Sequence, residues 1–214
     1  MLLSAMLPWR FFITEHLHKN VRWSLCAREI CYRNPLLGQF FQSGKTLPIE
    51  RGQGVGQPIM HVVASEVGKG SWVHVFPEGR INYNGKIGQL RWGVGKIFCD
   101  AVNANANAVP IILPFYHSGM GRILPKGGRL PRAGKQIKIY VGNAIPMEDL
   151  AERCRNAQLT EDQKCVWQDV VARIADALRS LETQGLPNPD QTDSKTRLEP
   201  HGQLEGALPA GDEV

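Results

Sequence analysis

The chain has 214 residues, of which 43% are hydrophobic, and this length and composition suit one domain with one sizeable core. No segment reaches the roughly 18 consecutive apolar residues that a membrane-spanning helix needs. The formal net charge of +5 suits an anionic lipid surface or a nucleic acid, but the sequence has no helix-turn-helix, zinc-finger or RNP-like pattern that would favour nucleic acid as a partner.

The first predicted elements are a short helix and a strand. The apolar, aromatic start of the chain, residues 2–12, indicates either a segment in a membrane interface or one packed on the core. Pro35–Gln42 predicts a helix that ends at a Ser-Gly pair, and Thr46–Glu50 predicts a strand. The glycine-rich loop 52–56 lacks the Gly-x-Gly-x-x-Gly spacing of a dinucleotide site.

A helix, a strand and a second helix follow. Apolar residues at helical intervals predict a helix over Gln57–Lys69, and an alternating run predicts a buried strand over Ser71–Phe76. Leu90–Val102 predicts a helix in spite of Gly93 and Gly95, which would allow close packing or lipid contact.

The second half of the chain predicts two strands and a long helix. Val109–Phe115 and Gln136–Val141 are apolar or alternating runs typical of strands. Asp162–Leu181 has apolar residues at three- and four-residue steps, which predicts an amphipathic helix that covers the core. Together the elements predict an α/β fold with a mostly parallel sheet and helices on its faces.

The end of the chain differs in charge from the rest. Residues 185–214 carry two bases and six acids, a net of −4, so residues 1–184 carry +9 (5 + 4). Because this terminal segment is also rich in proline, glycine and polar residues, we expect it to be a disordered acidic tail. A generally basic, solvated surface is an alternative explanation for the charge of residues 1–184.

The pentapeptide Phe76-Pro-Glu-Gly-Arg80 is the most informative feature of the sequence. Pro77 cannot donate to a sheet ladder and therefore ends the preceding strand, and Gly79 allows a sharp turn. Glu78 and Arg80 would then face outward from the carboxyl end of a strand, where open α/β sheets bind ligands. The guanidinium suits phosphate oxygens, and the carboxylate could hold it or accept a substrate hydroxyl. A surface turn with a chance ion pair is the alternative.

Two further predicted strands carry motifs comparable to this pentapeptide. Lys45-Thr-Leu-Pro-Ile-Glu-Arg51-Gly52 ends in Arg-Gly, and Val109-Pro-Ile-Ile-Leu-Pro-Phe-Tyr116 is bracketed by prolines. In this order the three strand ends resemble motif blocks two, three and four of the glycerophospholipid acyltransferases. The resemblance runs from about Trp23 to about Met147. Three flanking motifs narrow the resemblance to family members that exchange acyl chains between phospholipids and lysophospholipids in cardiolipin remodelling. They are Trp72-Val-His-Val-Phe-Pro-Glu-Gly79, Arg91-Trp-Gly-Val-Gly95 and His117-Ser-Gly-Met120.

The resemblance implies roles for six residues. Arg51 and Arg80 would hold the glycerophosphate headgroup, with Glu78 and Gly79 shaping its pocket, and the acyl channel would be bordered by Pro110 and Pro114. It also implies a reaction without coenzyme A or another cofactor, and without a metal. The implied partners are phospholipids and lysophospholipids, including cardiolipin and phosphatidylcholine. The implied location is peripheral or interfacial, on the intermembrane-space side of the outer or inner mitochondrial membrane.

The general base of this family does not occur in the sequence. Its first block is Asn-His-x4-Asp, in which the histidine would deprotonate the acceptor hydroxyl, but no histidine here has Asp five positions later. His61 with Glu66 is the nearest imitation, and His74 is interpreted as a satisfied core histidine rather than a substitute base. We therefore expect residues 1–184 to be an incomplete acyltransferase domain, with its N-terminal third missing through truncation, splicing or fragmentation. A non-catalytic lipid-binding remnant is the alternative.

Five cysteines occur at irregular spacing, and no Cys-x-x-Cys pair is among them. This pattern argues against a zinc site and against a disulfide framework. It predicts free thiols in a reducing compartment at Cys26, Cys31, Cys99, Cys154 and Cys165.

Overall fold

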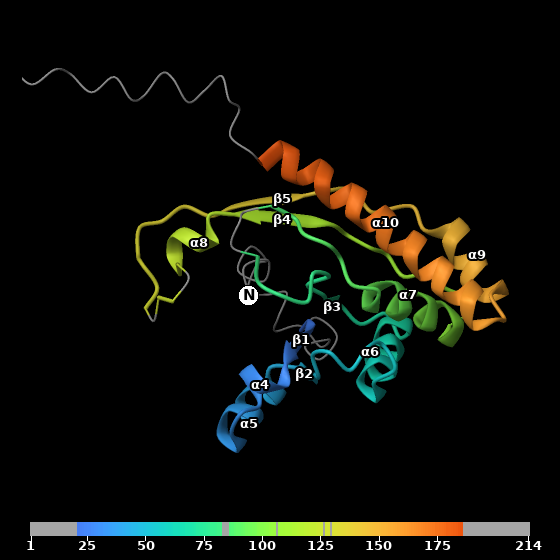
Figure 1. Cartoon of the computed structure of the whole chain (residues 1–214), viewed down its shortest axis with the longest axis horizontal. Helices are drawn as coiled ribbons and strands as arrows, with labels where there is room; N and C mark the ends of the chain where they lie inside the picture. The colour runs from blue at the N-terminus through green and yellow to red at the C-terminus, as the bar shows by residue number, and fades with distance from the viewer. Residues whose placement is uncertain (1–20, 83–85, 106, 126, 129, 186–214) are drawn as a thin grey trace, which may run out of the picture.

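The computed structural model describes residues 21–82, 86–105, 107–125, 127–128 and 130–185. The apolar start and the acidic tail lie outside these residues, so both stay predictions. Figure 1 shows two small sheets, one of them accompanied along its length by the long C-terminal helix. In the described part of the chain, no helix is long and apolar enough to span a bilayer.

The first sheet is parallel, with the strand order β2-β1-β3. Its central strand β1 (Trp23–Ala27) pairs with β2 (Thr46–Ile49) on one side and with the two-residue β3 (Val73–His74) on the other. The predicted strand at 46–50 is confirmed. Strand β3 is shorter than the predicted Ser71–Phe76, because the chain leaves the ladder for the turn that contains Pro77.

Three helices accompany this sheet: α4 (Arg28–Cys31), α5 (Pro35–Ser43) and α6 (Pro58–Gly68). The predicted helix at 35–42 is confirmed as α5, whose first turn is capped by the Asn34 side chain, which accepts from Leu37 N at 2.8 Å. Buried Met60 and Val63 of α6 pack against apolar residues of all three strands, so that this helix covers one face of the sheet.

The second sheet is antiparallel and holds β4 (Phe115–Ser118) and β5 (Lys138–Val141), with the short helix α8 (Met120–Ile123) between them in the chain. The predicted strand 109–115 is displaced, since Pro110 and Pro114 cannot donate to a ladder. In that segment only an isolated bridge joins Ile112 to Ile145, and the paired strand begins after Pro114.

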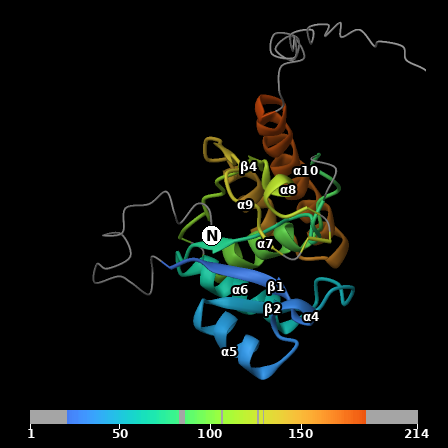
Figure 2. The same cartoon turned by 90° about the vertical axis from the view of Figure 1, so that its left-hand side faces the viewer.

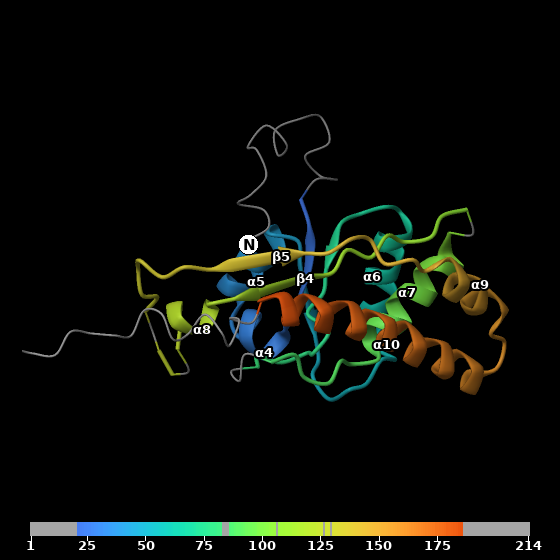
Figure 3. The ribbon, with the colours of Figure 1, turned by 90° about the horizontal axis from the view of Figure 1, so that it is seen from above.

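Three helices build the main core: α7 (Gly93–Ala104), α9 (Glu148–Asn156) and α10 (Thr160–Gly185). Figure 2 shows α7 and α5 on opposite sides of β1 and β2, and Figure 3 shows α10 lying along β4 and β5. Of the two possible roles for the α7 glycines, close packing applies at Gly95. A Cβ added there would lie 2.4 Å from the Trp167 carbonyl oxygen of α10. The predicted α/β fold, with a parallel sheet and accompanying helices, is confirmed.

The prediction of five free cysteines is wrong for four of them. Disulfides join Cys26 to Cys31 and Cys99 to Cys154, and Cys165 is free and exposed. The second pair is separated by 55 residues and is brought together only by the packing of α7 against α9, with Cα atoms 5.1 Å apart. Spacing in the sequence could not indicate such a pair.

Candidate functional site

Charged side chains follow each of the three parallel strands. Because parallel strands point the same way, the residues after them gather at one edge of the sheet, the carboxyl edge, where α/β proteins bind ligands. The residues of this edge that matter here are Arg28 and Glu29 after β1, Glu50 and Arg51 after β2, and Glu78 and Arg80 beyond β3.

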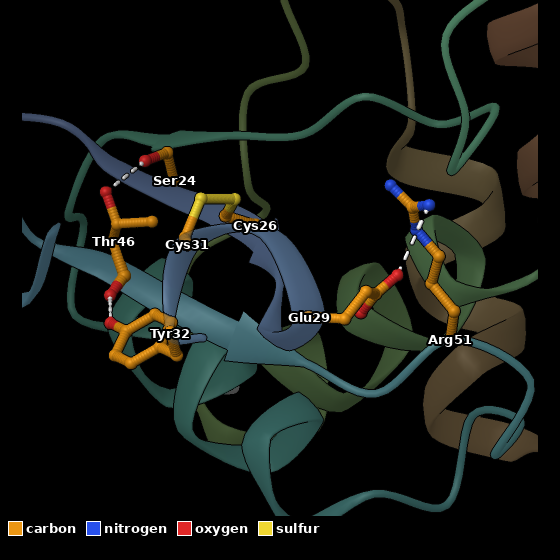
Figure 4. The surroundings of a disulfide bond; sticks show 7 residues. All are labelled: Ser24, Cys26, Glu29, Cys31, Tyr32, Thr46 and Arg51. Atoms are coloured by element: carbon orange, nitrogen blue, oxygen red, sulfur yellow. Dashed lines mark hydrogen bonds and ion pairs between the residues drawn. A yellow bond between two sulfur atoms is a disulfide. The ribbon is translucent and has the colours of Figure 1, made fainter. Parts of the chain in front are cut away.

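Two ion pairs continue the β1–β2 register past the strand ends. Arg28 Nε contacts a carboxylate oxygen of Glu50, and Arg51 Nη1 lies 3.3 Å from Glu29 Oε1. Figure 4 shows the second pair beside the Cys26–Cys31 disulfide. The side chains of Arg51 and Glu29 are 49% and 53% exposed. The Arg51 guanidinium is therefore paired, but in a contact that water reaches and that a ligand can replace.

Covalent and polar contacts hold helix α4 in place beside β2. The Cys26–Cys31 disulfide closes a loop that contains both Arg28 and Glu29. The Tyr32 hydroxyl donates to the Thr46 carbonyl oxygen, and the Ser24 and Thr46 hydroxyls lie 3.1 Å apart. These contacts appear together in Figure 4. They hold the backbone that carries Glu29 beside β2, within reach of Arg51.

The turn after β3 has the shape that its sequence predicts. Gly79 N donates to the Phe76 carbonyl oxygen at 3.1 Å, and Gly79 has φ +64°, in the left-handed region that favours glycine. Glu78 Oε2 accepts from Gly88 N at 3.0 Å and from Asn82 Nδ2 at 3.4 Å. The carboxylate thus ties the turn to the following loop, a contact that its sequence did not indicate.

Arg80 is exposed beyond this turn, and no ion pair is recorded for it among the described residues. A Cβ added to Gly88 would lie 2.9 Å from Glu78 Oε2 and 3.9 Å from an Arg80 terminal nitrogen, so that Arg80 and Glu78 lie beside the same loop. Strands β2 and β3 flank β1, and two strand spacings amount to about 10 Å. Arg51 thus follows one outer strand, and Arg80 lies six residues beyond the end of the other, with Glu29 following the strand between them.

The two prolines predicted to border an acyl channel lie in different surroundings. Pro110 lines a shallow cavity of about 230 Å³ with residues 144–148. Pro114 is buried, and its Cγ would lie 3.1 Å from a Cβ on Gly142, close to Leu181 of α10. The alternate residues Ile111 and Leu113 are 83% and 54% exposed. A shared channel for the two prolines stays a prediction.

The histidines of the described residues give no close copy of a histidine–carboxylate base. Glu66 accepts from Lys69 and Ser71 rather than from His61. His61 Nδ1 lies 3.6 Å from Asp100 Oδ2, an oxygen that also accepts from Lys96 at 2.5 Å. Since the charge of Asp100 is already matched by a lysine, it is a poor partner for activating His61.

His74 is buried as predicted but is not satisfied. It is 8% exposed, its Nε2 has no hydrogen-bond partner among the described residues, and its ring packs on those of Phe76 and Phe115. Burial, with smaller contributions from Arg22 and His117, lowers the pKa of His74 to about 4. Burial also lowers the pKa of His117, whose Nδ1 is likewise buried with no partner in the part of the chain that the structure describes.

The family model described as Acyltransferase matches residues 6–118, which include the whole carboxyl edge. The chain belongs to the acyltransferase family. It is 33% identical to tafazzin of Drosophila melanogaster over 166 residues, 77% of this chain and 42% of that protein. It is also 33% identical to taffazin of Dictyostelium discoideum over 145 residues, 67% of this chain and 50% of that protein.

A third relative of the family is the N-acylphosphatidylethanolamine synthase of Arabidopsis thaliana, 35% identical over 134 residues, 59% of this chain and 45% of that protein. The chain thus spans at most half the length of these relatives. No solved structure matches it.

Sequence reasoning missed Arg28 and Glu29 as part of the edge. The reason is that β1 has five residues and no turn residue at its end, so its sequence pattern does not predict a strand. The signal that could have found them is the opposite order of charge in Arg28-Glu29 and Glu50-Arg51, which pairs each acid with a base when two strands run parallel. No three His, Cys, Asp or Glu side chains of the described residues are grouped to hold a metal ion.

Proposed function

We propose that this chain is part of an O-acyltransferase that moves an acyl chain from a phospholipid to a lysophospholipid, as in the remodelling of cardiolipin at mitochondrial membranes. In such a reaction the acceptor hydroxyl attacks the donor's ester carbonyl, the donor ester bond breaks, and the donor leaves as a lysophospholipid with a new hydroxyl. What supports the proposal is the carboxyl edge, where Arg51 follows β2 and Arg80 lies beyond β3 in a chain of the acyltransferase family.

The edge supplies the binding part of this chemistry. Arg51 and Arg80 are proposed to contact the phosphodiester of the lipid, because guanidinium groups donate in the plane that phosphate oxygens need. Gly79 gives the turn its left-handed residue, and Glu78 holds the turn so that Arg80 keeps its place at the edge. Pro110 and Pro114 stay proposed neighbours of the acyl chains.

Radiolabelled acyl exchange tests the proposed activity. The purified chain is incubated with phosphatidylcholine that carries a labelled acyl chain and with a lysocardiolipin, without coenzyme A. The proposal predicts labelled cardiolipin, and less of it with Arg51→Ala. A full-length protein of the family serves as positive control for the assay. No labelled product from this chain, with the full-length control active, would contradict catalysis by this chain and favour the second function.

A second function is favoured by the lack of His-x4-Asp in this sequence. Without that base, the chain could bind lipid at a mitochondrial membrane through its basic residues and catalyse nothing. This alternative predicts that vesicles containing cardiolipin retain the chain without acyl exchange. Binding should weaken as salt rises from about 0.1 M to about 1 M, because the Debye length falls from about 10 Å to about 3 Å. Binding that salt leaves unchanged would exclude it.

A further inference from the structure

We infer that Glu29 is a headgroup-selecting residue, which favours phospholipids that carry a cation next to the phosphate over phospholipids that do not. The inference rests on the proposed function, since it assigns Arg51 to the lipid phosphate. Its starting point is the contact of Arg51 Nη1 with Glu29 Oε1 at 3.3 Å.

Glu29 fills, in the structure, the position that an anionic ligand of Arg51 would take. When a phosphodiester binds to the guanidinium, the Glu29 carboxylate loses its partner but stays close to the ligand. A carboxylate left beside a phosphate repels it, unless a positive charge lies between the two. The ammonium of a choline or ethanolamine headgroup is such a charge, attached to the same phosphate.

The second ion pair prevents Glu29 from finding a new partner nearby. Arg28, the adjacent cation, is already in contact with Glu50. The backbone that carries Glu29 is held at the edge, because helix α4 is tied to β1 by the Cys26–Cys31 disulfide and the adjoining Tyr32 hydroxyl donates to β2. We therefore expect the carboxylate to stay near the edge when the phosphate site is filled; Figure 4 shows it beside Arg51 in the free protein.

The charges of the edge thus match a zwitterionic headgroup better than an anionic one. Arg51 contacts the phosphate and Glu29 contacts the ammonium, so that the ion pair of the free protein is replaced by two ion pairs with the ligand. A headgroup with a neutral polyol has no positive charge to replace the ion pair that Glu29 loses with Arg51. Both side chains are about half exposed, so water screens the effect and we expect a preference of a few-fold rather than an absolute selection.

Two lysolipids with the same acyl chain separate this effect from phosphate binding. Lysophosphatidylcholine and lysophosphatidylglycerol share the phosphodiester and differ in the ammonium. Each is titrated, below its micelle concentration, into the purified chain, and tryptophan fluorescence reports the dissociation constant. Wild type should bind lysophosphatidylcholine more tightly, and Glu29→Gln should reduce this preference about twofold to fivefold, the factor of a half-exposed ion pair.

Glu161→Gln is the matched control, because Glu161 is an exposed glutamate in an ion pair with Lys164 at the start of α10. It should leave the ratio of the two constants unchanged. Glu29→Asp, which keeps the charge on a shorter side chain, should retain part of the preference and shows that a change in Glu29→Gln is not a loss of fold. A ratio that is the same in wild type and Glu29→Gln overturns the inference alone. If wild type binds neither lysolipid, the proposed function fails and this inference with it.

Discussion

Glu78 illustrates how a residue of the candidate site can serve it through the backbone. Its carboxylate accepts from Gly88 N and from the Asn82 side chain and so links the turn after β3 to the next loop. The sequence correctly predicted the turn, because the constraints on Pro77 and Gly79 are local. It could not predict the partner of Glu78, because Gly88 is ten residues further along the chain and the two meet only when the loop folds back.

Glu78→Ala should therefore lower the free energy of unfolding. The Gly88 N–H would lose its partner, a loss that typically costs about 1–3 kcal/mol. Glu78→Gln keeps an acceptor oxygen and should cost less. Urea unfolding of both variants, followed by circular dichroism, measures the difference. Equal stability of wild type and Glu78→Ala would contradict the linking role.

His74 should make the stability of the protein depend on pH. The folded protein keeps His74 neutral down to about pH 4, since its pKa there is about 4, whereas the unfolded chain protonates it near pH 6.5. The unfolded state therefore takes up the proton first as the pH falls. The stability from neutral His74 is complete above pH 6.5 and is lost progressively toward pH 4, by about 3 kcal/mol in all.

The measurement is urea unfolding at several pH values for wild type and for His74→Phe, which keeps an aromatic ring beside Phe76 and Phe115. The variant should lose less stability than wild type between pH 6.5 and pH 4. Because His117 also has a lowered pKa, His117→Phe serves as the comparison that separates the two histidines. Parallel curves for wild type and His74→Phe would contradict the assignment.

Helix α7 is the element on which the two halves of the packing depend. Its buried residues contribute both to the core with α9 and α10 and, through Ile97, to the smaller core on the parallel sheet. The helix was predicted from its apolar spacing, although its glycines weaken that pattern. The spacing could not indicate which neighbouring element requires a glycine in this helix. The structure shows that it is α10, because a Cβ added to Gly95 would lie 2.4 Å from the Trp167 backbone.

Gly95→Ala should consequently destabilise the protein, because the added methyl would force α7 and α10 apart. Overpacking of this kind typically costs about 1–3 kcal/mol. Gly121→Ala in α8 is the matched control, since its added Cβ would meet no described atom within 4 Å beyond its chain neighbours and its own helix backbone. Thermal unfolding should show a clear loss for the first variant and almost none for the second. Equal melting temperatures would show that the helices are not in close contact at this point.

The two disulfides join elements in different ways and should differ in their effect on stability. Cys26 and Cys31 are five residues apart, whereas Cys99 and Cys154 are 55 residues apart. In the chain-entropy account, the smaller loop contributes about 2 kcal/mol and the larger about 4 kcal/mol. Serine replacement of both cysteines of each pair, followed by urea unfolding, measures this. The account is wrong for this protein if the short-loop pair proves the more important.

For the molecule as a whole, the proposed function depends on an edge formed by segments far apart in the chain. Residues 28–29 contact residues 50–51 because β1 and β2 run parallel in register, and residues 78–80 lie beyond the third strand of the order β2-β1-β3. Arg51 and Arg80 were predicted as site residues from the motifs around them. Glu29 could not be predicted in this way, because its position depends on β1, whose short sequence pattern is not distinctive. The sequence thus indicated the cations of the site and not the anion between them.

The proposal that Arg51 and Arg80 contact one phosphodiester is tested most directly by a double-mutant cycle. Lysophosphatidylglycerol is titrated into wild type, Arg51→Ala, Arg80→Ala and the double variant, with Arg179→Ala of α10 as the control for a half-exposed arginine in an ion pair. Each single change at the edge should weaken binding about fivefold to tenfold. The loss of binding free energy in the double variant should differ from the sum of the two single losses by about 0.5 kcal/mol or more. Unchanged affinity in both single variants, or losses no larger than that of Arg179→Ala, would contradict the account.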